Sequence, residues 1–215
     1  MTALDISLYG ILDPARSNGR PLPELAAAAA RGGATLLQYR DKTSDTRTMV
    51  ETAHDILEAL EDFDIPLLIN DRVDVALAVG AHGVHLGQTD METQDARDLL
   101  GDDAIIGLTI KNRSHATNAP VDLLDYVCIG GVFQTLSKDN PVAIGLDGWS
   151  SVAGHFRQID HRLPVGAIAG IDETNCADVM SNGADGVAII SAMFMADDVE
   201  AVTKNLVKII KESRR

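Results

Sequence analysis

The sequence predicts a (β/α)8 barrel, the TIM-barrel architecture, as a single domain over residues 1–215. Three observations predict this fold. Eight short apolar runs that suit buried parallel strands alternate with helical segments. No shift in composition divides the chain. The segments GGATLLQYRDK, GAHGVHLGQTD and GADGVAIISAM form a degenerate internal echo, because each places Gly-Ala ahead of a buried strand.

The competing fold is a doubly wound open sheet. Such a sheet would place a Gly-rich phosphate-binding fingerprint in the turn between its first strand and first helix. The corresponding segment here is ILDPARSNG, which is not such a fingerprint. The closed barrel is therefore preferred.

The first half of the barrel is indicated by apolar runs that end at turn-forming residues. Pro23 and Gly32-Gly33 bound an Ala-rich helix, Asn70-Asp71 ends the third strand, and Gly80 stops the next helix. We expect strands at residues 6–12, 35–39, 67–69 and 84–86, and helices at 23–31, 45–63, 73–79 and 93–100.

The second half is patterned less regularly. A helix is expected within the weakly patterned segment that runs through residue 118, and residues 130–148 form the longest irregular stretch. Long loops in a compact domain are usually functional or mobile. We expect strands at 104–108, 126–129, 165–169 and 186–190, and the last three helices at 149–158, 175–181 and 199–210.

Charge and composition narrow the classes of function. A net charge of −14 argues against binding to nucleic acid or anionic membranes, which requires basic surface. The sequence has no credible transmembrane helix, and the absence of a secretory signal predicts a cytoplasmic protein. Cys128 and Cys176 form no metal spacing and are expected to be reduced, buried residues. The sequence does not determine the oligomeric state, and it is compatible with a homo-oligomer.

Two carboxylates follow neighbouring strands at the points where these strands end. Asp71 comes after the third strand and Asp90 after the fourth, so a parallel sheet brings both to one face. Two hard oxygen ligands suit Mg²⁺, which keeps several waters and binds substrate phosphates. The alternative is that both residues are helix N-caps, for which Asp is a preferred residue.

The strand ends together collect two groups that suit anions. Arg40, Lys42 and Lys138, with Mg²⁺ on Asp71 and Asp90, suit a diphosphate. Hydroxyl and backbone donors suit a monophosphate, because the loops after strands seven and eight of barrels often bind one. This second group is Thr135, Ser137, Gly170, Ile190 and Ser191. The small-molecule partners expected are therefore phosphorylated substrates.

Three stretches of the chain carry a family resemblance: QYRDK at 38–42, NDR with HLGQTD at 70–90, and DYVCIGGVFQTLSK at 125–138. They resemble the thiamine phosphate synthases, and the likeness extends from LYGILD to GADGVAIIS. The resemblance implies condensation of hydroxymethylpyrimidine diphosphate with thiazole phosphate to give thiamine phosphate and diphosphate. It also implies a dissociative reaction in which diphosphate leaves before the thiazole nitrogen attacks.

The resemblance also implies residue roles. Lys138, Arg40 and Lys42 would be catalytic, and Asp71 and Asp90 would hold Mg²⁺. Substrate binding would fall to Gln38, Tyr39, Arg40, Asp41, Lys42, Asn70, Thr109, Thr135, Leu136, Ser137, Lys138, Gly170, Ile190 and Ser191.

Three positions depart from the family pattern. Thr109 stands where Ser is more common, Ala169 where a glycine usually precedes Gly170, and Gly131 where proline is common. Whether these changes alter activity is open. The sequence likewise leaves open which form of thiazole phosphate is preferred.

Several alternatives remain at this point. Asp41 is as good a candidate for a helix cap as for a ligand, and His85 is expected to be a hydrogen-bonded interior histidine rather than a catalyst. The related thiazole tautomerases are the nearest rival family, but their reaction would not require Arg40, Lys42 and both carboxylates together. A non-catalytic protein that binds thiamine phosphates is the rival of another class.

Overall fold

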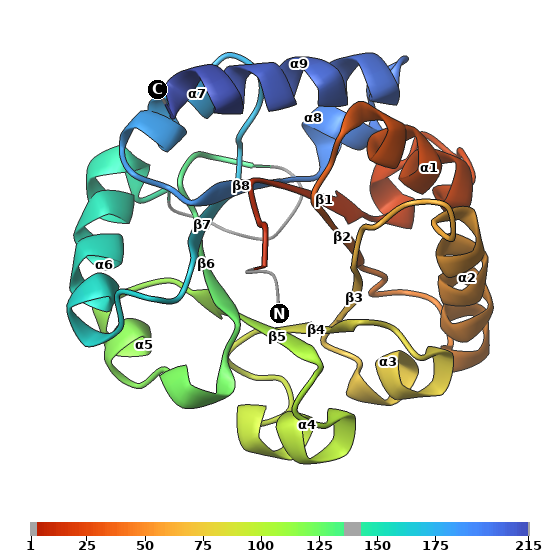
Figure 1. Ribbon diagram of the computed structural model, residues 1–215, viewed down its shortest axis with the longest axis horizontal. Helices are drawn as coiled ribbons and strands as arrows, with labels where there is room; N and C mark the ends of the chain where they lie inside the picture. Colours follow the sequence, from red (N-terminus) through yellow and green to blue (C-terminus); the bar gives the residue numbers. More distant parts are fainter. Residues whose placement is uncertain (1–3, 136–142, 215) are drawn as a thin grey trace.

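The computed structural model describes residues 4–135 and 143–214 and contains a closed barrel of eight parallel strands in sequential order. Figure 1 looks down the barrel, with the helices arranged around it. The predicted (β/α)8 fold is thereby confirmed. The strands are β1 (Leu8–Leu12), β2 (Leu36–Tyr39), β3 (Leu67–Asn70), β4 (Gly83–Leu86), β5 (Ile105–Ile110), β6 (Tyr126–Gly130), β7 (Val165–Ile168) and β8 (Gly186–Ile189).

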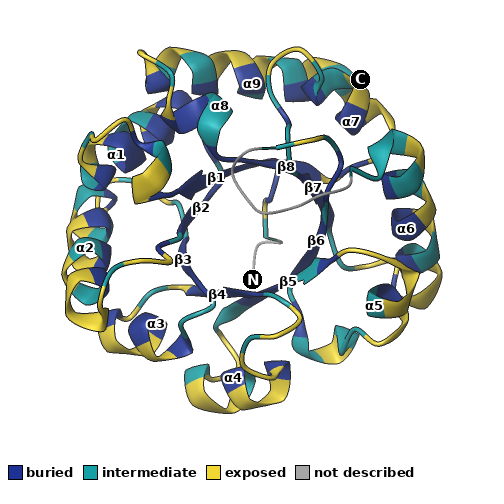
Figure 2. Ribbon diagram, turned by 180° about the vertical axis from the view of Figure 1, so that it is seen from behind, coloured by how far each residue is buried: buried dark blue, intermediate teal, exposed yellow. Residues whose placement is uncertain are grey.

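The helices form the outer ring, and each one covers its side of the sheet with apolar residues (Figure 2). Their bounds are α1 (Leu22–Gly32), α2 (Thr46–Ala59), α3 (Val73–Val79), α4 (Thr93–Leu100), α5 (Arg113–Thr117), α6 (Gly145–Ile159), α7 (Cys176–Ser181), α8 (Ser191–Phe194) and α9 (Val199–Ser213). Two short 3-10 helices, η1 (Pro14–Arg16) and η2 (Val121–Leu123), complete the described elements.

Alternation along each strand divides the buried residues into two clusters. Successive side chains of a strand point to opposite faces of the sheet. Leu37 and Tyr39 of β2 therefore join the large cluster between barrel and helices, whereas Leu36 joins the smaller cluster inside the barrel. This alternation decides which strand-end residues can face the barrel opening.

The barrel closes where β1 pairs with β8, with Leu8 opposite Val187 and Gly10 opposite Ile189. Gly186 permits this closure, because a Cβ on it would lie 1.8 Å from the Ile6 carbonyl oxygen. A Cβ on Gly83 would likewise lie 1.9 Å from the Ile105 carbonyl oxygen. The Gly-Ala pairs of the internal echo mark a different feature, because Gly33, Gly80 and Gly183 all have a positive φ in the turn before the strand.

Most predicted elements lie at or near their expected positions, with three informative differences. The helix after residue 130 begins at Gly145 instead of Trp149, because Ile144 N–H and Gly145 N–H donate to the carbonyls of Gly131 and Val132 at the end of β6. α2 ends at Ala59, earlier than residue 63. The chain turns at Ile190 into α8, a short helix that the sequence did not predict.

In residues 4–135 and 143–214, no helix combines the length and apolar character that a membrane span requires. Cys128 and Cys176 are both buried thiols outside any disulfide, as the sequence predicted.

Candidate active site at the carboxyl end of the barrel

A chain of hydrogen bonds fills the centre of the barrel below its opening. Gln38 Nε2 donates to the Tyr9 hydroxyl, and the Tyr126 hydroxyl donates to the Tyr9 oxygen at 2.9 Å. His85 lies 2.7 Å from the Tyr126 hydroxyl through Nδ1 and 2.8 Å from Thr109 Oγ1 through Nε2. His85 is therefore the hydrogen-bonded interior histidine that the sequence predicted. The network holds the Gln38 side chain inside the barrel and fixes the orientation of the Thr109 side chain.

Arg40 follows β2 and pairs with Asp13, which follows β1. Both side chains are largely buried, with 14% of Arg40 and 5% of Asp13 exposed. Arg40 Nε and the amide nitrogen of Asn70 are buried and have no hydrogen-bond partner in the described residues. Buried polar atoms are nearly always paired, so these two donors are suited to an anionic ligand.

Lys42 and two carboxylates form a second charged group after β2, β3 and β4. Lys42 Nζ pairs with Asp71, and Asp90 Oδ2 accepts a hydrogen bond of 2.7 Å from Gly87 N–H. Burial raises the pKa of Asp71, the Lys42 ammonium opposes that effect, and the neighbouring Asp90 raises the pKa further. The structure therefore brings the two carboxylates together, and a cation there would relieve their repulsion.

The donor set fits a magnesium ion that is only partly coordinated by protein. Asp71 and Asp90 are hard oxygen ligands, and Mg²⁺ usually takes one or two carboxylates and fills its octahedron with water and phosphate. In the part of the chain that the structure describes, no three His, Cys, Asp or Glu side chains gather as a metal site. Asp71 and Asp90 would thus be the two carboxylate ligands that the described residues supply.

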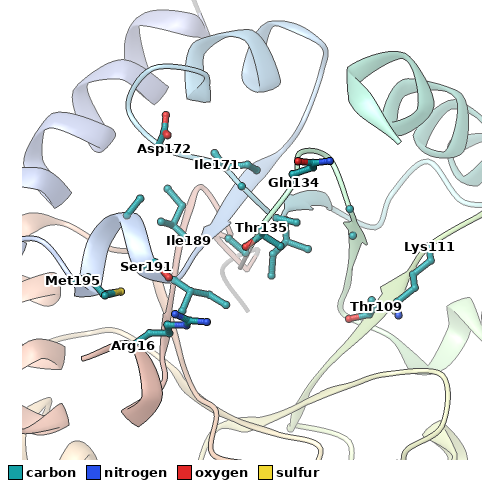
Figure 3. Close-up of a pocket in the computed structure, with 18 residues that line it drawn as sticks. Arg16, Thr109, Lys111, Gln134, Thr135, Ile171, Asp172, Ile189, Ser191 and Met195 are labelled. Atoms are coloured by element: carbon teal, nitrogen blue, oxygen red, sulfur yellow. The ribbon is translucent and has the colours of Figure 1, made fainter. Parts of the chain in front are cut away.

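Beside these charged groups lies a cavity of about 500 Å³ at the ends of β5 to β8. Its lining includes the described residues of the predicted monophosphate group, together with Thr109; these are Thr109, Thr135, Gly170, Ile190 and Ser191. Figure 3 shows Ser191 and Thr135 at this cavity. Arg40, Lys42, Asp71 and Asp90 do not line it, so the two predicted groups occupy separate parts of one end of the barrel.

The backbone after β7 is unusual at two successive residues. Ala169 has φ +99° and Gly170 has φ +65°. A side chain on Gly170 would meet the Gln134 carbonyl oxygen at 2.5 Å, so only glycine fits there. Ala169 is therefore conformationally strained, because a residue with a side chain rarely adopts a positive φ.

Two predicted substrate-binding side chains are directed away from the opening. Tyr39 lies in the layer between barrel and helices, and its hydroxyl donates to Asp41 at 3.1 Å. Asp41 also accepts from Thr43 N–H at 2.8 Å and Ser44 N–H at 3.0 Å. Burial alone would raise the pKa of Asp41, but these hydrogen bonds lower it to about 2. The geometry thus favours the capping role of Asp41 and a core role for Tyr39.

The predicted residues Leu136, Ser137 and Lys138 lie outside the described residues. Among the residues at the site that the sequence did not indicate are Asp13, the partner of Arg40, and Arg16, which lines the cavity. Asp13 follows β1 directly, and Arg16 ends the 3-10 helix after it. The rule that selects residues after strand ends would have found them if it had been applied to the first strand.

Comparisons with known proteins identify the family of the chain. A family model described as "Thiamine monophosphate synthase" matches residues 8–193. A thiamine-phosphate synthase of Agrobacterium fabrum is 50% identical over 206 residues, which cover 95% of this chain and 94% of that protein. One from Chloroflexus aurantiacus is 43% identical, with 94% of this chain and 92% of that protein covered. The chain belongs to the thiamine monophosphate synthase family.

Among solved structures, a thiamine phosphate pyrophosphorylase from Pyrococcus furiosus superposes with a TM-score of 0.84. It is 35% identical, and the match covers 98% of each chain. In this thiamine monophosphate synthase family member, the full barrel is therefore shared with a solved relative.

The electrostatic coupling of the two carboxylates can be tested with Asp90→Asn. The amide oxygen can still accept from Gly87 N–H, but the like charge beside Asp71 is removed. We expect the pKa of Asp71 to fall and Mg²⁺ affinity to drop about tenfold or more, because one anionic ligand is lost. NMR pH titration and calorimetry measure both effects. Asp95→Asn, on the exposed face of α4, is the control. An unchanged Asp71 pKa would contradict the coupling.

The strain after β7 gives a second prediction. Ala169→Gly should raise the free energy of unfolding by about 1 kcal/mol, because glycine adopts a positive φ without steric cost. Ala167→Gly, in the buried strand β7, should lower it by about 1 kcal/mol or more, because a packed methyl group is lost. Urea unfolding compares the two variants, and equal destabilisation would exclude strain at Ala169.

Proposed function

We propose that this protein is a thiamine phosphate synthase, a transferase that joins a pyrimidine methyl diphosphate to a thiazole phosphate. The supporting observation is the juxtaposition at one barrel end of a charged group suited to diphosphate and a cavity lined with phosphate-binding residue types. Each relative reported above carries the name of this activity. No nucleophilic side chain needs to be invoked, because the second substrate supplies the nucleophile.

At the diphosphate end, Arg40, Lys42 and Asn70 are proposed to hold the leaving group. Arg40 Nε and the Asn70 amide are buried donors that a phosphate oxygen could satisfy. Lys42 pairs with Asp71 and is half exposed, so it can shift from the carboxylate toward incoming phosphate. Lys138 is assigned to the same group on sequence grounds alone.

Asp71 and Asp90 are proposed to hold Mg²⁺. When bound, the ion would neutralise charge that develops on the diphosphate as it leaves. The raised pKa of Asp71 means that protons compete for this carboxylate above its ordinary range, so binding of the cation should weaken as the pH falls.

The chemistry is proposed to be dissociative. The bond between the pyrimidine methylene carbon and the diphosphate oxygen breaks, and its electron pair leaves with diphosphate. The exocyclic amino group of the pyrimidine stabilises the resulting cation, and the thiazole nitrogen donates its lone pair to the methylene carbon. The protein then contributes chiefly by stabilising the leaving group and by orienting the two rings.

Gln38 and Thr109 are proposed to contact the pyrimidine between the two phosphate ends. Both belong to the hydrogen-bonded chain through Tyr9, Tyr126 and His85, which holds them in fixed rotamers. A preorganised site of this kind loses little entropy on binding. We propose that the reaction takes place in the cytoplasm, because both cysteines of the chain are buried thiols outside any disulfide, as is usual in a reducing compartment.

A turnover assay with both substrates and Mg²⁺ tests the proposal. We expect thiamine phosphate and diphosphate in equal amounts, and loss of turnover when the cation is chelated. Arg40→Gln should lower kcat/KM by about tenfold to a hundredfold, because a charge-assisted contact to phosphate is lost. The control is Arg31→Gln, which removes an exposed arginine that pairs with Glu200.

Two results would contradict the proposal. Isomerisation of thiazole phosphate without any use of the diphosphate would indicate a tautomerase. Tight binding of thiamine phosphate with no turnover would indicate a binding protein.

A further inference from the structure

The monophosphate part of the site lacks a cation in the group that the sequence predicted. Thr135 and Ser191 offer hydroxyls and Gly170 offers backbone, all of them neutral. A phosphomonoester carries a charge of about −1.5 to −2 near pH 7. Asp172 adds a carboxylate to the same cavity, and the chain has a net charge of −14. A positive side chain would therefore strengthen the binding of a dianion here.

Arg16 is positioned to supply that charge. It ends η1, lines the cavity together with Ser191 and is half-buried. Figure 3 shows the Arg16 guanidinium on the same side of the cavity as Ser191, with Thr109 and Lys111 on the other side. Arginine binds phosphate in a planar, bidentate geometry that suits recognition of a phosphoryl group.

The backbone around Arg16 is fixed by Asp13. Asp13 Oδ1 accepts from Ala15 N–H at 2.9 Å, and its carbonyl oxygen accepts from Arg16 N–H at 2.8 Å. The other carboxylate oxygen of Asp13 pairs with Arg40. One buried carboxylate therefore holds the turn that carries Arg16 and also the arginine of the diphosphate group.

The loop after η1 is in turn fastened to α8. Arg20 donates to the Phe194 carbonyl oxygen at 2.7 Å, and Asn18 Nδ2 donates to the Met195 carbonyl oxygen at 3.0 Å. These bonds join the loop after β1 to the short helix that begins at Ser191. Arg16 and Ser191 are thus carried on two segments that are bonded to each other.

We propose that Arg16 binds the phosphate of the second substrate and sets the specificity for a phosphorylated thiazole over the free alcohol. This inference rests on the proposed function for the identity of that substrate. Among the residues that the structure describes, Lys111 is the other cation on the cavity lining, but it is exposed and lies on the opposite side from Ser191. The carboxylate of Asp172, also on the lining, accepts through Oδ1 from Thr174 N–H at 2.8 Å and from Thr174 Oγ1 at 2.6 Å.

The test compares Arg16→Gln, Arg16→Lys and the control Lys208→Gln on α9, outside the cavity. We expect Arg16→Gln to raise KM for thiazole phosphate about tenfold to a hundredfold, with KM for the pyrimidine diphosphate within about twofold of wild type. Arg16→Lys should raise KM for thiazole phosphate less than Arg16→Gln does. Calorimetry should show weaker binding of thiazole phosphate to Arg16→Gln but equal binding of thiazole alcohol. Thermal unfolding checks that each variant is folded.

The outcomes separate this inference from the proposed function. An unchanged affinity of Arg16→Gln for thiazole phosphate would overturn the role of Arg16, and so would an equal rise in KM for both substrates. Wild-type protein that binds thiazole phosphate without turnover would contradict the proposed function. The affinities of wild type and Arg16→Gln for thiazole phosphate and for thiazole alcohol would still decide the role of Arg16. Wild-type protein that binds no thiazole phosphate would overturn both.

Discussion

Closure of the sheet between β1 and β8 is the constraint on which the site depends. Once eight parallel strands close, all their carboxyl ends lie at one opening, and residues as distant in sequence as Asp13 and Ser191 become neighbours. Closure requires close backbone approach at the start of some strands, which Gly186 and Gly83 allow. The Gly-Ala pairs mark the positive-φ turns that precede β2, β4 and β8, whereas Gly83 and Gly186 mark the close backbone approach.

Charge explains how so acidic a protein could bind two polyanions. Two of the described cations at the opening, Arg40 and Lys42, are held by carboxylates that also have other roles. Asp13 pairs with Arg40 and caps η1, and Asp71 pairs with Lys42 beside Asp90. An arginine held by one carboxylate still has further donors for phosphate, as the unpaired Nε of Arg40 indicates. These cations can therefore be paired with carboxylates in the absence of ligand and still keep hydrogen-bond donors for a bound phosphate.

The sequence was sufficient for the fold and for the residues that follow strand ends, because hydrophobic runs, glycine stops and parallel topology determine both. It was insufficient where the direction of a side chain, or hydrogen bonds between distant segments, determine the structure. Tyr39 stands between Gln38 and Arg40 in the motif. Side chains alternate between the two faces of a strand, however, so the Tyr39 side chain points outward into the helix layer. The early start of α6 depends on hydrogen bonds to β6, and α8 and the η1 turn depend on contacts between segments far apart in sequence. No local pattern encodes such bonds.

The central claim is that one end of the barrel holds a diphosphate and a monophosphate side by side. A crystal structure of the protein with thiamine phosphate, diphosphate and Mg²⁺ tests it most directly. The account predicts the diphosphate within hydrogen-bond reach of Arg40 and Asn70, and the phosphate of thiamine phosphate beside Ser191 in the cavity. A diphosphate bound away from Arg40, or a thiamine phosphate whose phosphate lies outside that cavity, would contradict it.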